Sequence, residues 1–430
     1  MSYSERARQL LASSQAREGD TVRLKVRGKE HEGILMPHHE FSHPDVIVIK
    51  LKSGYNMGLK VDEGSELTLE SRAQERTKKA KDAVNGNDLP TVSFLGTGGT
   101  IASYVDYRTG AVHPALKAEE LVATVPELSE ICRMRSHVVF SIFSENMTPQ
   151  NWQTLASAVA DELNDGAEGV IVPHGTDTLG FTSAALSFML GDVPRSVLLV
   201  GAQRSSDRPS SDSYINLLSS ARFCVNANAA EVFALMHGES SDSYVHIHRG
   251  TKVRKMHTSR RDAFQSVNCA PVARLGMQGE LEILSECKPK SRTKVVPDTR
   301  MEKDVALLYF YPGMSTEIVK KVMEDHKGLI MAGTGLGHVS RDMVHVLKDV
   351  ISEGKPVVMT SQCLGGRVNL NVYDTGRDLL SAGVIPGEDM LPETALIKLM
   401  WVLGRTQDMP EVEKEMLTDR RAEISRRRDL

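Results

Sequence analysis

From Thr91 onward, short apolar segments alternate with longer amphipathic ones, and this alternation constrains the fold more than any other feature of the sequence. Stretches such as 148–165 carry apolar residues at helical spacing. Short apolar strands joined by amphipathic helices are typical of a parallel sheet with crossover helices, so we predict an α/β fold here. The apolar segments that predict strands are 91–96, 137–143, 169–173, 196–201 and 231–236.

Two polar stretches, 73–90 and 288–304, are predicted linkers that divide the chain into three domains. Residues 91–287 are predicted to form a large α/β domain, and residues 305–430 a smaller C-terminal α/β domain that begins with further apolar strands. Residues 1–72 contain several short segments in which apolar and polar residues alternate, which predicts a small all-β barrel domain. A chain of 430 residues is long enough for two or three such domains.

The composition narrows the class of protein without identifying it. A formal net charge of −4 argues against binding nucleic acid through overall charge. Five widely spaced cysteines without a CxxC pair fit a reduced cytosolic protein. The charged N-terminus does not read as a signal peptide, and no apolar run approaches the roughly 20 residues of a membrane span. We therefore expect a cytoplasmic protein.

Residues 410–430 predict a charged helix whose last arginines are solvated, with contact to RNA as the minor alternative.

Small and polar residues follow five of the predicted strands. Ligands of open parallel sheets bind beyond the carboxyl ends of the strands, so these loops predict the site. The five loops are 96–100, 144–147, 174–178, 201–207 and 237–240.

The first of these loops, GTGGT, favours acyl transfer over nucleotide binding. It lacks the lysine of a phosphate-binding loop, and Ile101 replaces the third glycine of a dinucleotide fingerprint. Glycines beside a threonine hydroxyl let a planar amide approach the backbone, whose N–H groups stabilise an oxyanion. No histidine or cysteine spacing predicts a metal site.

A threonine nucleophile needs groups that move protons. Thr176 and Asp177, in HGTDT, suit this role, although both residue types also favour helix N-termini, which is the simpler interpretation. A lysine buried beside Asp177 would complete the set, and Lys252 and Lys255 are both candidates. The residue pattern alone leaves the choice between them open.

These motifs resemble those of bacterial-type L-asparaginases and glutaminase-asparaginases. The resemblance rests on GTGGTIAS, VPHGTDTL, VGAQRSSDRPSSDSYINL and FQSVN, and in the last domain on SQCLGGRVNLNVYDTG. It covers about Thr91 to Thr406. With the N-terminal all-β domain included, the whole chain resembles the D subunits of archaeal glutamyl-tRNA(Gln) amidotransferases.

This resemblance implies that the chain releases ammonia from glutamine or asparagine. A partner, the E subunit of the amidotransferase, would bind tRNA(Gln) and use the ammonia to convert Glu-tRNA(Gln) to Gln-tRNA(Gln). No cofactor is implied for this chain, and ATP and Mg²⁺ belong to the partner. The family builds its site at a dimer interface, which implies a homodimer within a heterotetramer. A free-standing asparaginase and a non-catalytic amino-acid-binding protein remain the alternatives.

Residue by residue, the resemblance assigns catalytic roles to Thr100, Thr176, Asp177 and Lys255. The substrate-binding residues that it implies are Gly99, Ser144, Glu145 and Gly175. One position departs from the family pattern, because Ala111 stands where many asparaginases carry a lid tyrosine. This departure suggests a hydrolase that stays slow until its partner and tRNA arrive. The preference between glutamine and asparagine stays open.

Overall fold

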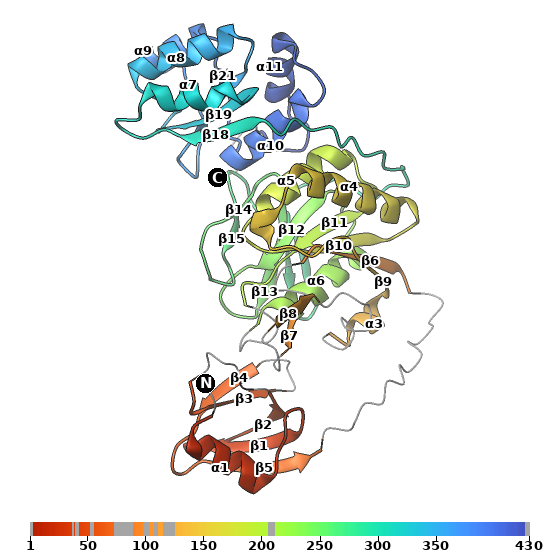
Figure 1. Ribbon diagram of the computed structural model, residues 1–430. Coiled ribbons are helices and arrows are strands. Elements are labelled where there is room, and N and C mark those ends of the chain that lie inside the picture. The colour runs from red at the N-terminus through yellow and green to blue at the C-terminus, as the bar shows by residue number, and fades with distance from the viewer. Residues whose placement is uncertain are drawn as a thin grey trace.

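The computed structural model places the chain in three units (Figure 1). At residue 56 and in the short strands 103–106 and 111–114 only the backbone is described. Gly99 and Thr100 lie outside the described residues, as do the last arginines of the tail. None of the helices that the structure describes has the length and apolar composition needed to cross a membrane. The described residues are 3–36, 38, 43–51, 56–72, 89–98, 103–106, 111–114, 125–204 and 211–425.

The N-terminal unit is a small antiparallel sheet with one helix. Its five strands lie in the order β4-β3-β2-β1-β5. Alternate residues of β1, such as Val22 and Leu24, point into its core. Helix α1 contributes Ala7 to this core and was not predicted from the sequence. Its elements are α1 (Glu5–Ser14), β1 (Thr21–Val26), β2 (Lys29–Leu35), β3 (Val46–Lys50), β4 (Asn56–Lys60) and β5 (Glu66–Ser71).

The large unit is built on an eight-stranded sheet in the order β17-β16-β13-β12-β11-β10-β6-β9. Its strands β9, β6, β10, β11 and β12 are parallel, and the others are antiparallel. The strands are β6 (Thr91–Gly96), β9 (Arg133–Val138), β10 (Gly169–Pro173), β11 (Ser196–Val200), β12 (Val232–His237), β13 (Tyr244–Arg249), β16 (Ala273–Gly276) and β17 (Leu281–Ile283).

Helices cover both faces of this sheet because its central strands are apolar on both sides. Along β10, Val170 packs with α4 and α5, whereas Ile171 packs with α6 on the opposite face. Two short hairpins lie outside the sheet. These helices and hairpins are α3 (Leu128–Ile131), η2 (Ser144–Asn146), α4 (Pro149–Asn164), α5 (Leu179–Leu190), α6 (Ser213–Asn226), β7 (Ser103–Asp106) with β8 (Ala111–Pro114), and β14 (Val253–Lys255) with β15 (Phe264–Ser266).

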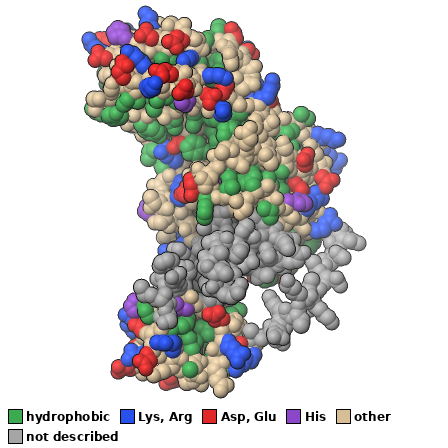
Figure 2. All heavy atoms as spheres, viewed as in Figure 1, with side chains coloured by type: hydrophobic (Ala, Val, Ile, Leu, Met, Phe, Trp, Pro, Cys, Tyr) green, Lys and Arg blue, Asp and Glu red, His purple; other side chains and the backbone are tan. Residues whose placement is uncertain are grey.

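The C-terminal unit is a four-stranded parallel sheet in the order β18-β19-β20-β21. Helices α7 and α8 cover one face, and α10 packs between the other face and α5 of the large unit. Its exterior carries charges of both signs (Figure 2). The elements are β18 (Val305–Tyr309), α7 (Thr316–Glu324), β19 (Gly328–Gly333), α8 (Arg341–Ser352), β20 (Val357–Ser361), α9 (Asp374–Ser381), β21 (Ile385–Pro386), α10 (Pro392–Leu403) and α11 (Met409–Leu417).

Two predicted elements differ in the structure. The strand predicted at 137–143 is β9, which ends at Val138 because its partner β6 ends opposite it at Gly96. The helix predicted over 410–430 ends at Leu417. Beyond that residue the chain turns back, because Glu423 is fully buried against Lys398.

Candidate active site

The strand order places the site between two neighbouring strands. After β6 the chain continues to β9, which pairs with one edge of β6. Strand β10 pairs with the other edge of β6, and the chain continues from β10 to β11, away from β9. Such a point opens a crevice at the carboxyl ends of the strands. Thr97 joins the two strand ends, since its hydroxyl donates to the carbonyl of Pro173 at 2.9 Å. The segments that follow β6, β9 and β10 therefore meet at this edge.

Lys255 joins the segment that follows β10 at this edge of the sheet. Its Nζ atom donates to Thr176 Oγ1 at 2.9 Å and to Asp177 Oδ1 at 2.7 Å. Thr176 and Asp177 follow β10 directly, whereas Lys255 ends β14, so the fold brings together residues that are 79 and 78 positions apart. The three side chains that the sequence grouped as a proton-handling set thus share one hydrogen-bonded cluster.

The two charged members of this cluster differ in exposure. The side chain of Lys255 is 16% exposed, and that of Asp177 is 68% exposed. Water therefore screens the carboxylate and leaves the amine in the drier position. The amine and the Thr176 hydroxyl are within hydrogen-bonding distance, which is the geometry that proton transfer between them requires.

The place of each lysine relative to β14 explains why Lys255, and not Lys252, reaches Thr176. Lys255 is the last residue of β14, whereas Lys252 lies in the turn before the strand, where its N–H donates to the Arg249 carbonyl at 3.0 Å. Val253 and Lys255 point toward α5 and the crevice, whereas Lys252 points away and binds Asp389 of the C-terminal unit at 2.7 Å. The structure thus separates the two lysines that the sequence left as alternatives.

Ser144 lies beside the lysine cluster in a position set by close packing. It is buried at the start of η2, and its carbonyl accepts a hydrogen bond from Thr178 Oγ1 at 2.7 Å. A Cβ atom at Gly175 would lie 2.7 Å from Ser144 Cβ, so only glycine allows this approach. The neighbouring Glu145 is exposed. Ser144 and Gly175 therefore form one wall of the crevice.

A second glycine packs directly against Thr176, one of the predicted catalytic residues. Gly201, at the end of β11, packs against Thr176, and a Cβ there would come within 2.7 Å of Thr176 Cγ2. The sequence placed Gly201 at a strand end and gave it no role. Its contact with Thr176 explains why a small residue is needed at that point.

His174 lies beneath the site and also received no role from the sequence. It is buried, and its Nδ1 donates to the Gly175 carbonyl at 2.7 Å. Its Nε2 is buried and has no hydrogen-bond partner among the described residues. Burial lowers the pKa of His174 to about 4, so the ring is neutral near pH 7. A histidine directly after a wholly apolar strand is the signal that points to such burial.

Stability is expected to fall as pH drops below about 6.5, because two histidines are buried in the neutral form. Burial lowers the pKa of His174 to about 4 and that of His248 to about 3, from an ordinary value of 6.5. The unfolded chain therefore binds protons first, and each histidine costs about 1.4 kcal/mol of unfolding free energy per pH unit below its unfolded pKa.

Chemical denaturation of the full chain between about pH 6.5 and 5 checks this expectation. His248→Gln removes one titrating group, so its stability is expected to fall less steeply, by about 1.4 kcal/mol per pH unit. Equal slopes for the variant and the wild type would contradict the assignment.

The remaining predicted residues cannot be placed. Thr100 and Gly99 lie outside the described residues, and at Ala111 the structure describes only the backbone of β8. Within the described parts of the chain, no group of three or more His, Cys, Asp or Glu side chains is arranged to hold a metal ion. The described part of the site therefore consists of Thr176, Asp177, Lys255 and the wall formed by Ser144 and Gly175.

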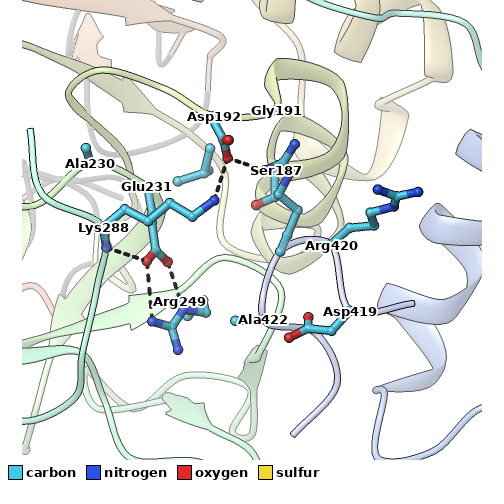
Figure 3. A pocket seen from close by; sticks show the side chains of 12 residues that line it. Ser187, Gly191, Asp192, Ala230, Glu231, Arg249, Lys288, Asp419, Arg420 and Ala422 are labelled. Carbon is cyan, nitrogen blue, oxygen red and sulfur yellow. Dashed lines mark hydrogen bonds and ion pairs between the residues drawn. The ribbon is translucent and has the colours of Figure 1, made fainter. Parts of the chain in front are cut away.

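A charged cavity of about 300 Å³ lies elsewhere, between the large unit and the C-terminal tail. Two of the carboxylates that line it form ion pairs, as Asp192 binds Lys288 and Glu231 binds Arg249 (Figure 3). Arg421 of the tail also binds Asp192. None of the predicted site residues that the structure describes lines this cavity, and the pair of Arg421 with Asp192 attaches the tail to the large unit.

Family models match all three units of the chain. The GatD N-terminal domain matches residues 16–69. The model described as Asparaginase, N-terminal matches residues 91–288, and the Glutaminase/Asparaginase C-terminal domain matches residues 304–416.

Relatives with similar sequences span the whole chain. The D subunit of glutamyl-tRNA(Gln) amidotransferase from Pyrococcus furiosus is 51% identical over 420 residues, which cover 95% of this chain and 94% of that protein. The D subunit of the same enzyme from Methanothermobacter thermautotrophicus is 46% identical and covers 100% of this chain and 99% of that protein.

Solved structures of asparaginases share the fold of the two α/β units. The thermostable L-asparaginase of Thermococcus kodakarensis superposes with a TM-score of 0.70 at 31% identity, over 78% of this chain and 99% of its own. L-asparaginase I of Vibrio cholerae superposes with a TM-score of 0.67 at 28% identity, again over 78% of this chain and 99% of its own.

Proposed function

Because the chain belongs to the family of the D subunits of glutamyl-tRNA(Gln) amidotransferases, we propose that it releases ammonia from the side-chain amide of glutamine or asparagine. The ammonia serves a partner protein that amidates Glu-tRNA(Gln) in a cytoplasmic complex. The observation that carries the proposal is the contact of Lys255 Nζ with both Thr176 and Asp177 at the carboxyl edge of the sheet.

The proposed reaction is a double displacement. A threonine hydroxyl, assigned to Thr100, attacks the amide carbon, and the leaving ammonia takes a proton. Water then attacks the resulting ester and releases the acid and the free threonine. Thr176, Asp177 and Lys255 move the protons in both steps, because Lys255 in its neutral form can accept the proton of Thr176. Thr176 is the alternative nucleophile.

Ser144 is proposed to bind the α-carboxylate of the substrate, with Gly175 beside it. Gly99 is proposed as a further substrate-binding residue. A buried hydroxyl and nearby backbone N–H groups suit a carboxylate. Asp177 and Glu145 supply negative charge for the α-ammonium group. The substrate is thereby bound through its amino-acid groups, and the amide faces the threonines.

Ser144→Ala is expected to raise KM about tenfold and to change kcat by less than about threefold, because it removes one hydrogen bond that is made equally in the ground state and the transition state. Steady-state ammonia release at varied glutamine and asparagine checks this split. The matched control is Ser157→Ala, since Ser157 is an exposed residue of α4 that bonds only the carbonyl of Gln153. A large loss of kcat with an unchanged KM would contradict the role of Ser144.

We also propose that two copies of the chain form a homodimer within a larger assembly that includes the E subunit of the amidotransferase. The carboxyl edge of the C-terminal sheet and the loops after β20 expose large apolar side chains that a second copy would cover. ATP and Mg²⁺ act in the partner. The exposed side chains at this edge are Tyr309, Tyr311, Leu364, Val372 and Tyr373.

The experiment that tests the function measures ammonia release from glutamine and from asparagine, by the chain alone and with the E subunit, ATP and tRNA(Gln). Ammonia release that rises on addition of partner and tRNA supports the amidotransferase role, and the faster amide identifies the substrate. Equal rates with and without the partner would support the free-standing asparaginase instead. No release under any condition would refute both.

A further inference from the structure

The hairpin that carries Lys255 is bound to the C-terminal unit along one face. Strands β14 and β15 pair only with each other and have three residues each. A two-stranded hairpin of this length is barely stable by itself. Its position, and with it that of the Lys255 amine, must therefore come from contacts with neighbouring elements.

One of these contacts is a buried ion pair at the base of the hairpin. Lys252 Nζ lies 2.7 Å from Asp389 Oδ2, and the two side chains are 1% and 6% exposed. The second oxygen of Asp389 accepts a hydrogen bond from the Ser425 N–H at 2.9 Å, so the carboxylate is itself held in place. Such a pair is fixed in geometry, because either charge would be unpaired if it moved.

The other strand of the hairpin is tied to the same loop. Asn268, two residues after β15, donates to the carbonyls of Asp389 and Gly366 at 3.0 Å each, and accepts from the Gly366 N–H at 2.7 Å. The Val267 N–H donates to the Lys252 carbonyl at 2.9 Å, which closes the base. Both ends of the hairpin thus converge on Asp389.

We propose that Lys252 and Asp389 are positioning residues for the amidase reaction. They hold the base of the hairpin against the C-terminal unit, so that Lys255, three residues further on, reaches Thr176 and Asp177 of the large unit. This inference rests on the proposed function, because it assigns Lys252 a role through Lys255. Among the described residues, the ammonium of Lys252 binds Asp389 and not Thr176, Asp177 or Lys255.

The test compares three variants of the full chain in complex with the E subunit and tRNA(Gln). Lys252→Met is expected to lower kcat at least about tenfold and to leave KM within about twofold, because the Ser144 wall is untouched. Lys252→Met with Asp389→Asn leaves no unpaired charge and keeps an acceptor for Ser425, so it is expected to regain stability while kcat stays low.

Lys290→Met is the matched control for loss of a buried lysine. Lys290 binds Glu168 and the Cys224 carbonyl at the opposite edge of the sheet, and its side chain is 15% exposed. It is expected to lower the midpoint of thermal unfolding while kcat per folded molecule stays within about twofold of wild type. A purely structural role for Lys252 would give its variants this same result, and would overturn the proposal.

Hydrogen exchange of the peptide 253–266 separates this proposal from the proposed function. Faster exchange of this peptide in Lys252→Met, but not in Lys290→Met, is expected because the hairpin loses the buried ion pair that is one of its attachments to the C-terminal unit. Unchanged exchange would overturn the proposal even in an active enzyme. Faster exchange in a protein that releases no ammonia would show the anchor and refute the amidase function instead.

Discussion

Thr176→Val is expected to lower the rate of ammonia release about 10³-fold, with the protein still folded, because valine keeps the shape of threonine and removes the hydroxyl. That hydroxyl lies 2.9 Å from Lys255 Nζ, and its loss leaves the amine with Asp177 alone. The methyl group packed against Gly201 is retained. Steady-state ammonia release from glutamine and asparagine by the complete complex measures the effect.

Thr154→Val is the matched control for this substitution. Thr154 is an exposed residue of α4 whose hydroxyl donates only to the Gln150 carbonyl. The same chemical change there is expected to leave ammonia release within about twofold of wild type. If Thr176→Val kept more than about a tenth of the wild-type kcat, Thr176 would have no essential part in proton transfer.

Lys398→Met is expected to lower the unfolding free energy of the two α/β units by about 3–5 kcal/mol, the largest stability loss that we predict. Lys398 and Glu423 form an ion pair in which both side chains are fully buried. The ammonium also donates to the carbonyls of Met416 and Thr418 at 2.9 and 2.7 Å. Burial lowers the pKa of Lys398. Burial alone would raise the pKa of Glu423, but the charge and hydrogen bond of Lys398 oppose this, and the pKa of that carboxyl is lowered. Removing the lysine leaves a buried carboxylate without its counter-charge.

Denaturant unfolding followed by tryptophan fluorescence measures this loss, since Trp401 lies in α10 beside Lys398. The double variant with Glu423→Gln is expected to recover most of the stability, because one oxygen, Oε2, accepts from both the Arg420 and the Arg421 N–H groups and an amide oxygen can take its place. Lys320→Met breaks an exposed pair with Glu317 in the same unit and is expected to leave the midpoint unchanged. Equal effects of the two single variants would contradict the role of burial.

The sequence predicts the buried strands of this fold because parallel strands covered on both faces are apolar throughout. β10 is an example, since all of its residues are buried. The edge strand β9 was misplaced because its sequence, RMRSHV, is mainly polar and the apolar residues follow it. Helix α1 was missed because only a few of its residues, such as Ala7, face the core.

The position of Ser144, Thr176 and Asp177 after predicted strands, together with the family resemblance, predicts that they lie at one edge of the sheet. The residue pattern alone leaves Lys252 and Lys255 as alternatives, and only the resemblance assigns Lys255. The turn before β14, from which Lys252 reaches Asp389, is not evident in the sequence. The contact between Lys252 and Asp389 joins residues 137 positions apart, and no local pattern at either residue points to the other. Side-chain packing between units determines such contacts, and a single sequence does not reveal it.

Helix α10 has a consequence for how proteins of this kind change in evolution. It packs against α5 of the large unit and against three strands of the C-terminal sheet, so one apolar core runs through both units. If either unit alone were exchanged for that of a distant relative, the two sides of this shared core would come from different proteins, and their side chains would not be adapted to pack together. The N-terminal sheet has a core of its own and can be gained or lost in inheritance without that penalty.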